Sequence, residues 1–316
     1  MTGRPKMIEI VEVGPRDGLQ NEKHVFSTQA KIELVRRAFA SGVRRIEITS
    51  FVNPARVPQM ADAEAVIAGV EDLPGVRLSA LALNDRGADR AIATSVQEVT
   101  FVVVASETFN VRNQGATVRE TLNMWKTVSR RLADAGKFRS LVIGAAFGCP
   151  FEGEVPVEKV VEIAKEASDI GVEEIALADT IGVAVPRDIE IRFRAVAEAV
   201  PGMPLRAHLH NTRNTGYANA DAALRSGATV LDSSAGGIGG CPFAPQATGN
   251  IATEDLIYML QRSRVETGVN HALTIDTARW LEAGMNRRVP AQSAHVSTFP
   301  PDDTPRSRLS QQAGIV

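Results

Sequence analysis

The stretch Met7-Ile-Glu-Ile-Val-Glu-Val-Gly-Pro-Arg-Asp-Gly18 decides how the fold of this chain is interpreted. Its first part, residues 7–13, is rich in β-branched residues and predicts a strand. The part after this strand lacks the G-x-G-x-x-G spacing that binds a dinucleotide in an open doubly wound sheet, and Pro15 interrupts it. The doubly wound sheet, which is the main alternative architecture, is therefore disfavoured.

The pattern of a short apolar run followed by an amphipathic segment recurs along the chain. We predict strands at residues 7–13, 44–50, 77–83, 98–105, 140–147, 173–178, 204–210 and 228–233. We predict helices near residues 28–41, 60–69, 85–95, 117–136, 156–170, 186–200, 215–227 and 252–263. Eight successive βα units predict an α/β fold, a (β/α)8 TIM barrel with its active site at the carboxyl-terminal rim of the strands.

Several predicted helix boundaries carry their own local signals. Ser27-Thr28 can cap the first helix, and Ser41-Gly42 and Ser226-Gly227 can end helices. Pro156 and Pro186 suit first helical turns, where a missing N–H costs nothing. These signals agree with the periodic pattern.

The length of 316 residues suits a single barrel, since such barrels reach about 250 residues as one domain. We predict one catalytic domain at residues 1–290, including a terminal helix after residue 265, and a polar, poorly ordered tail at residues 291–316.

Composition excludes several classes of protein. A net charge of −2 offers no basic surface for nucleic acid, and no apolar run reaches the length of a membrane span. Only about six residues precede the first strand, which leaves no room for a signal peptide, so we expect a cytoplasmic protein. Cys149 and Cys241 are too few for a disulfide framework and are treated as free thiols.

Polar residues gather where the predicted strands end. Asp17 follows the first strand, Glu47 lies in the second, Asp179 ends the sixth, and His208 and His210 end the seventh. Because the two histidines are two residues apart on a strand, their side chains point to the same side, and an inward-facing pair can hold one metal ion. The alternatives are that the histidines only satisfy hydrogen bonds and that Asp17 only shapes a turn.

Mixed nitrogen and oxygen ligands suit Mn²⁺, Co²⁺, Zn²⁺ or Fe²⁺, whereas Mg²⁺ generally prefers oxygen. Our expectation for the cofactor is a divalent metal, Mg²⁺ or Mn²⁺. After the eighth strand, residues 236–250 form a glycine-rich loop that could act as a lid or bind an anion. Cys241 in this loop is either a proton donor or an inert turn residue, and Cys149 is the weaker candidate.

One known family shares a set of long motifs with this chain. They are residues 13–23 (VGPRDGLQNEK), 46–54 (IEITSFVNP), 57–60 (VPQM), 148–153 (GCPFEG), 179–182 (DTIG), the histidine pair, 236–244 (GGIGGCPFA) and 249–255 (GNIATED). On these residues the chain resembles the 3-hydroxy-3-methylglutaryl-CoA lyases, metal-dependent (β/α)8 barrels of the DRE-TIM type. The resemblance spans roughly residues 8–260.

The resemblance implies cleavage of 3-hydroxy-3-methylglutaryl-CoA to acetyl-CoA and acetoacetate. It implies the metal ligands Asp17, His208, His210 and Asn250, of which only Asn250 has no independent signal in the sequence. A cation near the thioester enolate lowers the barrier, and Arg16 beside Asp17 suits this task. The resemblance assigns protonation of the enolate to Cys241.

For the general base and for the binding of coenzyme A, the sequence offers several candidates each. Asp17, His208 and Glu47 are all candidates for the general base, while Glu47 and Asp179 are also expected to orient Arg16, the histidines or the substrate hydroxyl. Candidates for binding coenzyme A are Gln20, Lys23, Asn113 and Arg56. The expected partner is a small acyl-CoA, and the family suggests a homodimer.

This chain also departs from the family pattern near the histidines. It has Asn211 where the family usually has aspartate, Asn214 in place of a glycine, and Ala178 in place of a glycine before Asp179. A related substrate, such as citramalyl-CoA or a 3-hydroxy-3-alkylglutaryl-CoA, is therefore an alternative. Less favoured are a condensing synthase of the isopropylmalate or homocitrate type, which would carry a C-terminal regulatory domain, and a non-catalytic CoA-binding barrel.

Overall fold

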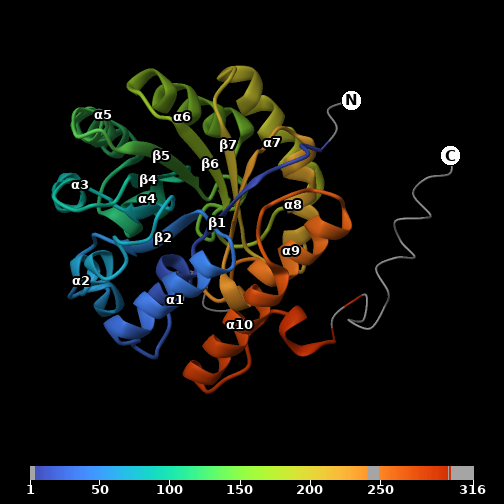
Figure 1. Cartoon of the computed structure of the whole chain (residues 1–316). Helices are drawn as coiled ribbons and strands as arrows, with labels where there is room; N and C mark the ends of the chain where they lie inside the picture. Colours follow the sequence, from blue (N-terminus) through green and yellow to red (C-terminus); the bar gives the residue numbers. More distant parts are fainter. Residues whose placement is uncertain (1–3, 241–248, 298, 300–316) are drawn as a thin grey trace, which may run out of the picture.

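Eight parallel strands close into a barrel in the order of the sequence, as the computed structural model of residues 4–240, 249–297 and 299 describes (Figure 1). The first strand pairs with both the second and the eighth, which closes the ring. The strands are β1 (Glu9–Glu12), β2 (Arg45–Ser50), β3 (Arg77–Leu81), β4 (Glu98–Val104), β5 (Phe138–Gly144), β6 (Glu174–Asp179), β7 (Leu205–Leu209) and β8 (Val230–Ser233). The predicted (β/α)8 barrel is confirmed.

Helices surround the barrel on the outside (Figure 1). They are α1 (Thr28–Ala40), α2 (Ala63–Ala68), α3 (Asp85–Ile92), α4 (Glu107–Gln114), α5 (Val118–Asp134), α6 (Val157–Ile170), α7 (Pro186–Ala199), α8 (Gly216–Arg225), α9 (Thr253–Arg262) and α10 (His271–Met285). Short helical turns lie at Gly14–Gly18, Pro58–Met60, Ala235–Gly237 and Ser293–His295. Among the described helices, none has the length and apolar character needed to cross a membrane.

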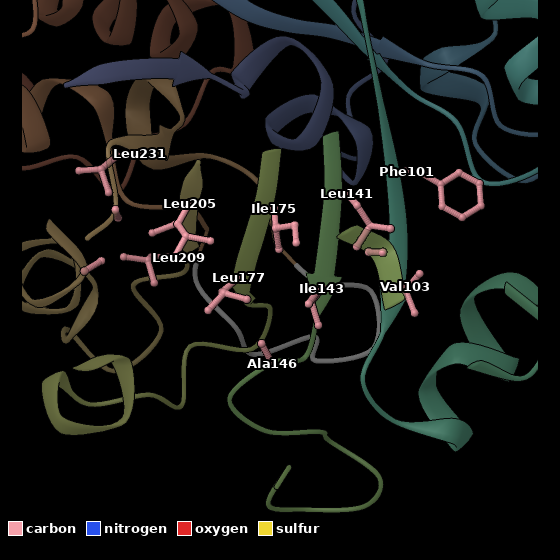
Figure 2. Close-up of a cluster of buried hydrophobic side chains, with 14 of the residues drawn as sticks. Phe101, Val103, Leu141, Ile143, Ala146, Ile175, Leu177, Leu205, Leu209 and Leu231 are labelled. Carbon is pink, nitrogen blue, oxygen red and sulfur yellow. The ribbon is translucent and has the colours of Figure 1, made fainter. Parts of the chain in front are cut away.

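The core lies between strands and helices because alternate strand residues point outward. Phe101 and Val103 of β4, Leu141 and Ile143 of β5, and Ile175 of β6 are fully buried there (Figure 2). These residues are register partners on neighbouring strands, for example Phe101 with Leu141. Branched and aromatic side chains at every second position therefore seal the helices onto the barrel.

Inside the barrel, the layer at the amino-terminal ends of the strands, which we call the lower layer, is ionic rather than apolar. Arg45 is fully buried, and its guanidinium contacts Glu98 at 2.6 Å and Glu174 at 2.7 Å. Arg206 of β7 adds a second buried cation, 3.4 Å from Glu174. Burying several charges is tolerable only when each has partners, as is the case here.

Helix ends follow the predicted signals with small differences. Ser27 accepts a hydrogen bond from the N–H of Ala30 and caps α1, while Ser41 and Ser226 are the C-caps of α1 and α8. Pro186 opens α7 as predicted, but Pro156 is the N-cap of α6 and precedes its first turn.

Helix α4 is missing from the sequence-based prediction. Its boundary signals were present, because the hydroxyl of Ser106 caps the N–H of Phe109 and Gly115 ends the helix in a left-handed conformation. The helix is short, however, and has no clear apolar face, so periodicity alone does not reveal it.

The segment after α10 packs against the barrel domain. Ala291 and Ala294 are buried, and Arg279 of α10 donates a hydrogen bond to the carbonyl of Ala294. Residues 300–316, which make up most of the predicted tail, lie outside the described residues. The division into a domain at 1–290 and a tail at 291–316 stays a prediction.

Candidate metal and substrate site

A cavity of about 160 Å³ opens at the carboxyl-terminal ends of the strands. Charged side chains from β7, β8, β2 and the turn after β1 line one part of it, and mostly apolar side chains from β3 to β6 line the other. This is the rim at which TIM barrels carry their active sites.

Three metal-binding side chains meet in this cavity. Ligand atoms of Asp17, His208 and His210 all lie within 4.8 Å of one another. The Nε2 atoms of the two histidines are 3.3 Å apart, and Nε2 of His208 is 3.9 Å from Oδ2 of Asp17. The predicted residues therefore come together in a geometry that suits one divalent ion.

The turn after β1 explains how Asp17 reaches the histidines. The carbonyl of Val13 accepts hydrogen bonds from the N–H groups of Asp17 at 2.7 Å and of Gly18 at 3.1 Å. Pro15 lies at the start of this tight turn, where its missing N–H is not needed. The turn thus carries the Arg16 and Asp17 side chains to the rim, where both line the cavity.

Asn250 supplies a fourth possible ligand. Its backbone forms a β-bridge with His210, and its side-chain N–H₂ donates to Oδ2 of Asp17 at 2.8 Å and to the carbonyl of Ile238 at 3.2 Å. Its Oδ1 is buried and has no hydrogen-bond partner among the described residues. A buried acceptor with no partner is costly, and a bound cation would satisfy it.

Close packing around Asn250 requires glycine in the neighbouring loop. A Cβ on Gly239 would lie 2.7 Å from the side-chain nitrogen of Asn250, and Gly239 has a φ of +105°. A Cβ on Gly249 would lie 2.2 Å from the carbonyl oxygen of Gly237. These glycines let the loop after β8 come close enough for Asn250 to join the cluster.

Arg16 links the cluster to Glu47. Its guanidinium donates to Asp17 at 2.7 Å and to Glu47 at 2.7 Å and 2.6 Å. Burial alone would raise the pKa of Asp17, but Arg16 and the two histidines outweigh it and lower the pKa to about 2. For Glu47 burial wins over the attraction of Arg16, and its pKa is raised. Asp17 is thus held as an anion.

Asp232 of β8 is a site residue that the sequence analysis missed. Its Oδ2 lies 3.0 Å from Nδ1 of His208, and its Oδ1 lies 3.5 Å from Nε of Arg206. Metal-binding histidines generally need such a carboxylate on their other ring nitrogen. That rule predicts that a partner exists, but only the barrel register identifies Asp232 as the residue.

Asp179 has a different environment from the one expected. Its two carboxylate oxygens accept the N–H groups of Val183 and Ala184 at 2.9 Å and 3.1 Å. No hydrogen bond to Arg16 or to the histidines is found for it within the described residues. In this structure Asp179 shapes the loop that follows β6, and burial raises its pKa.

The candidate coenzyme A residues divide into two groups. Gln20 and Asn113 line the cavity, whereas Lys23 and Arg56 are exposed and do not line it. Of the four candidates, Gln20 and Asn113 therefore lie next to the candidate site.

The two cysteines also differ. Cys241 lies outside the described residues, as does most of the glycine-rich loop, so its role as a proton donor stays a prediction. Cys149 is buried, and its sulfur lies 2.9 Å from the hydroxyl of Ser106. It does not line the cavity, which agrees with its weaker candidacy.

The departures near the histidines are mostly remote from the cavity. Oδ1 of Asn211 accepts the N–H of Gly216 at the start of α8, and Asn214 has a φ of +56° in the same turn. Asparagine tolerates this left-handed conformation better than most residues do. Of the three departures, only Ala178 lines the cavity.

Together, the fold and the site define a (β/α)8 barrel with a candidate divalent-metal centre at its carboxyl-terminal rim. The family model described as HMGL-like matches residues 7–281. The chain belongs to the HMGL-like family.

Characterised relatives match over nearly their whole length. The (R)-citramalyl-CoA lyase of Chloroflexus aurantiacus is 43% identical over 90% of this chain and 93% of its own. The hydroxymethylglutaryl-CoA lyase of Bacillus subtilis is 38% identical over 92% of this chain and 98% of its own.

A solved structure agrees equally well. It is an HMG-CoA lyase from Acinetobacter baumannii in complex with coenzyme A and 3-methylmalate, which is 33% identical, covers 96% of this chain and 99% of its own, and has a TM-score of 0.91.

Proposed function

We propose that this protein is a divalent-metal-dependent lyase that cleaves 3-hydroxy-3-methylglutaryl-CoA to acetyl-CoA and acetoacetate. The observation that carries the proposal is the cluster of Asp17, His208, His210 and the unpartnered Oδ1 of Asn250, with Arg16 beside it. The HMGL-like family and the relatives named hydroxymethylglutaryl-CoA lyase support the reaction class. A bond cleavage that leaves an enolate is favoured by a metal that binds substrate oxygens and by a fixed cation near the enolate oxygen.

Asp17, His208, His210 and Asn250 would hold the metal. When bound, a divalent ion supplies Lewis acidity toward the oxygens of the substrate. Mg²⁺ and Mn²⁺ are the proposed ions, and the two imidazole donors favour Mn²⁺ of the pair.

Glu47 is the base that we favour for the hydroxyl proton. Its Oε1 is buried with no hydrogen-bond partner among the described residues, and the residue lines the cavity. Asp17 is less suited, because Arg16 and Asn250 occupy its two oxygens. His208 is less suited as well, because Asp232 occupies one ring nitrogen and the other faces the ligand cluster.

Loss of the hydroxyl proton lets the bond between C3 and C2 break, and its electron pair becomes the thioester enolate of acetyl-CoA. Arg16 would stabilise the negative enolate oxygen, since its fixed guanidinium is already oriented by Glu47 and Asp17. A proton delivered to the enolate carbon completes acetyl-CoA. We assign this proton to Cys241, on the family resemblance.

A second candidate function is cleavage of citramalyl-CoA. It is favoured by the 43% identity to the (R)-citramalyl-CoA lyase of Chloroflexus aurantiacus. The chemistry would be the same, because the carbon that carries the hydroxyl is again one end of the bond that breaks. We also keep the homodimer and the cytoplasmic location as predictions from the family and the sequence.

An assay of acetyl-CoA release from both thioesters tests the proposal. We expect the chain to release acetyl-CoA from at least one of them, to lose this activity after exhaustive chelation, and to regain it with Mn²⁺ or Mg²⁺. The thermal midpoint should also rise on metal addition, because ligands bind only the folded chain. Full activity in the metal-depleted protein would refute the metal assignment, and no activity on either thioester would refute the proposed reaction.

A further inference from the structure

Asn250, the fourth possible metal ligand, lies in a short segment, residues 249–252, that is tied to the ends of two strands. The N–H of Ile251 donates to the carbonyl of Leu209, the last residue of β7, at 3.1 Å. The carbonyl of Ile251 accepts the N–H of Ser234, which directly follows β8, at 3.0 Å. The backbone of this segment therefore determines where the Asn250 side chain lies.

The last residue of the segment, Ala252, is held by a helix instead of a strand. Ala252 is buried, and its N–H donates to the hydroxyl of Tyr217 in α8 at 3.0 Å. The same hydroxyl donates its own proton to Oδ2 of Asp255 in α9 at 3.1 Å. Burial, with a smaller effect from Asp255, raises the pKa of Tyr217, so the phenol stays protonated and can serve both partners. Because a buried N–H without an acceptor is costly, the hydroxyl of Tyr217 fixes this end of the segment.

The acceptor of the Tyr217 proton is itself fixed by the chain that follows α10. The carboxylate of Asp255 accepts the N–H groups of Gln292 at 2.9 Å and of Ser293 at 2.6 Å. Together with the Tyr217 hydroxyl, these two groups give the carboxylate three donors. Hydrogen bonds to a carboxylate are strong, so Asp255 has one preferred orientation and holds the tyrosine in place.

Packing at the start of α8 brings Tyr217 to the segment. A Cβ on the preceding residue, Gly216, would lie 2.5 Å from Cγ2 of Ile251, so the glycine permits a close approach of the helix. Asn211 adds a second connection, because its Oδ1 accepts the N–H of Gly216 and its N–H donates to the carbonyl of Gly249, both at 3.1 Å. The start of α8 and the segment therefore keep a fixed distance.

We propose that Tyr217 is a positioning residue for the metal site and that it acts through Asn250. By fixing the N–H of Ala252, two residues further along, it keeps the side chain of Asn250 beside Asp17, where Oδ1 has no hydrogen-bond partner within the described part of the chain. Tyr217 does not line the cavity, so its effect on metal binding must pass through the segment. The inference rests on the proposed metal site and adds a residue that supports it.

Replacing Tyr217 by phenylalanine tests this role, because the change removes the hydroxyl and keeps the ring. We expect Tyr217→Phe to weaken Mn²⁺ binding, measured by calorimetry, about 2- to 30-fold. In an Asn250→Ala background the same change should alter the affinity by less than about twofold, because the group through which Tyr217 acts is gone. Asp17, His208 and His210 remain in that background, so Mn²⁺ binding stays measurable.

The other tyrosine of the chain provides a matched control. Tyr258→Phe removes a hydroxyl from α9 that makes no hydrogen bond with the described residues, and it should leave the Mn²⁺ affinity unchanged. Asp255→Asn is a second variant if Tyr217→Phe does not fold. It leaves one acceptor oxygen in place of two, and should weaken Mn²⁺ binding in the wild-type background but not in the Asn250→Ala background.

Equal Mn²⁺ affinities for wild type and Tyr217→Phe would overturn the inference. An equal loss of affinity in both backgrounds would overturn it as well, since a general loosening of the fold acts whether or not Asn250 is present. In both cases the wild type still binds Mn²⁺, and the proposed metal site stands. Absence of Mn²⁺ binding by the wild type would instead refute that site, and this inference with it.

Discussion

The contact between Asp232 and His208 explains how one histidine is prepared to bind a metal. With Nδ1 of His208 donating to Asp232, the lone pair of Nε2 is left facing His210 and Asp17. Burial raises the pKa of Asp232, but Arg206 and His208 outweigh it, so the carboxyl stays ionised with a lowered pKa. Asp232 is thus a positioning residue, because it acts on the metal through His208.

Replacing Asp232 should weaken metal binding while the residues that bind the metal stay in the cavity. We expect Asp232→Asn to weaken Mn²⁺ binding by about 10- to 100-fold, because the amide holds the ring less firmly and makes it less basic. Titration calorimetry with Mn²⁺ measures this effect. Asp72→Asn, at a side chain that is 64% exposed, is the matched control. Equal Mn²⁺ affinities for wild type and Asp232→Asn would contradict the role.

Arg16 should matter for the reaction more than for the metal. Its guanidinium lines the cavity in which the proposed reaction would take place, and losing a fixed donor of this kind costs about 10²-fold or more in kcat. We therefore expect Arg16→Gln to lower kcat by that factor while Mn²⁺ affinity changes much less. Steady-state kinetics and calorimetry separate the two. Arg119→Gln, on an exposed helix surface, serves as the control. An unchanged kcat would remove Arg16 from the mechanism.

The sequence predicted the residues that sit at strand ends, because their place in the barrel follows from periodicity alone. Asp17, His208 and His210 belong to this group. Asp232 could not be predicted, since its role depends on β7 and β8 being in register. Asn250 had no signal of its own either, because a bridge to His210 across the loop is a tertiary feature.

At the scale of elements, Glu12 ties the start of the barrel to its end. Its Oε1 accepts the N–H groups of Gly14 and Ala235, both at 2.8 Å, and its Oε2 accepts the hydroxyl of Thr253 at 2.6 Å. The turn that carries Arg16 and Asp17 is therefore joined to the segment after β8. The carboxylate of Glu254 accepts a hydrogen bond from the next N–H of that segment, which belongs to Gly236.

This joint should make stability depend on pH. Burial, with a smaller effect from Asp232, raises the pKa of Glu12 from 4.5 to about 7, and the pKa of neighbouring Glu254 is raised well above its usual value. Between pH 4.5 and 7, only the folded chain keeps the Glu12 proton. The free energy of unfolding should therefore fall as pH rises through this window, by about 3 kcal/mol at most.

Glu12→Gln provides the measurement, because glutamine keeps the acceptor for both N–H groups but does not titrate. The difference in unfolding free energy between wild type and Glu12→Gln, from urea titrations at pH 5 and pH 8, should favour wild type more strongly at pH 5. Titration of groups that do not interact with Glu12 cancels in this difference. A difference that is the same at both values would show that Glu12 ionises normally in the folded chain.

Most elements could be predicted because their apolar periodicity is strong. All eight strands were found within a few residues of their observed bounds. The second predicted helix, residues 60–69, proved to be two pieces, since a short turn at Pro58–Met60 precedes α2. Pro58 opens that turn, and local proline geometry of this kind overrides the average pattern.

On the scale of the whole molecule, buried charges run through the interior of the barrel. Arg45 contacts Glu98 and Glu174 in the lower layer, and Arg206 connects these carboxylates to Asp232 below the candidate metal ligands. The sequence shows only charged residues scattered over five strands. It could not predict this arrangement, because each charge is acceptable only next to partners that the closed barrel supplies.

Arg45 is the centre of this arrangement, so its loss should destabilise the entire barrel. Without it, Arg206, at 3.7 Å and 3.4 Å, would be the one cation still paired with Glu98 and Glu174 among the described residues. Removing one partner of a buried ion pair costs about 3–5 kcal/mol. We expect Arg45→Met to lower the free energy of unfolding by that amount, as measured by urea titration. Arg44→Met, at the exposed neighbouring position, should have a much smaller effect. If the two variants were equally stable, the carboxylates would have to be neutral or hydrated in the barrel, and the ionic layer would not hold the strands together.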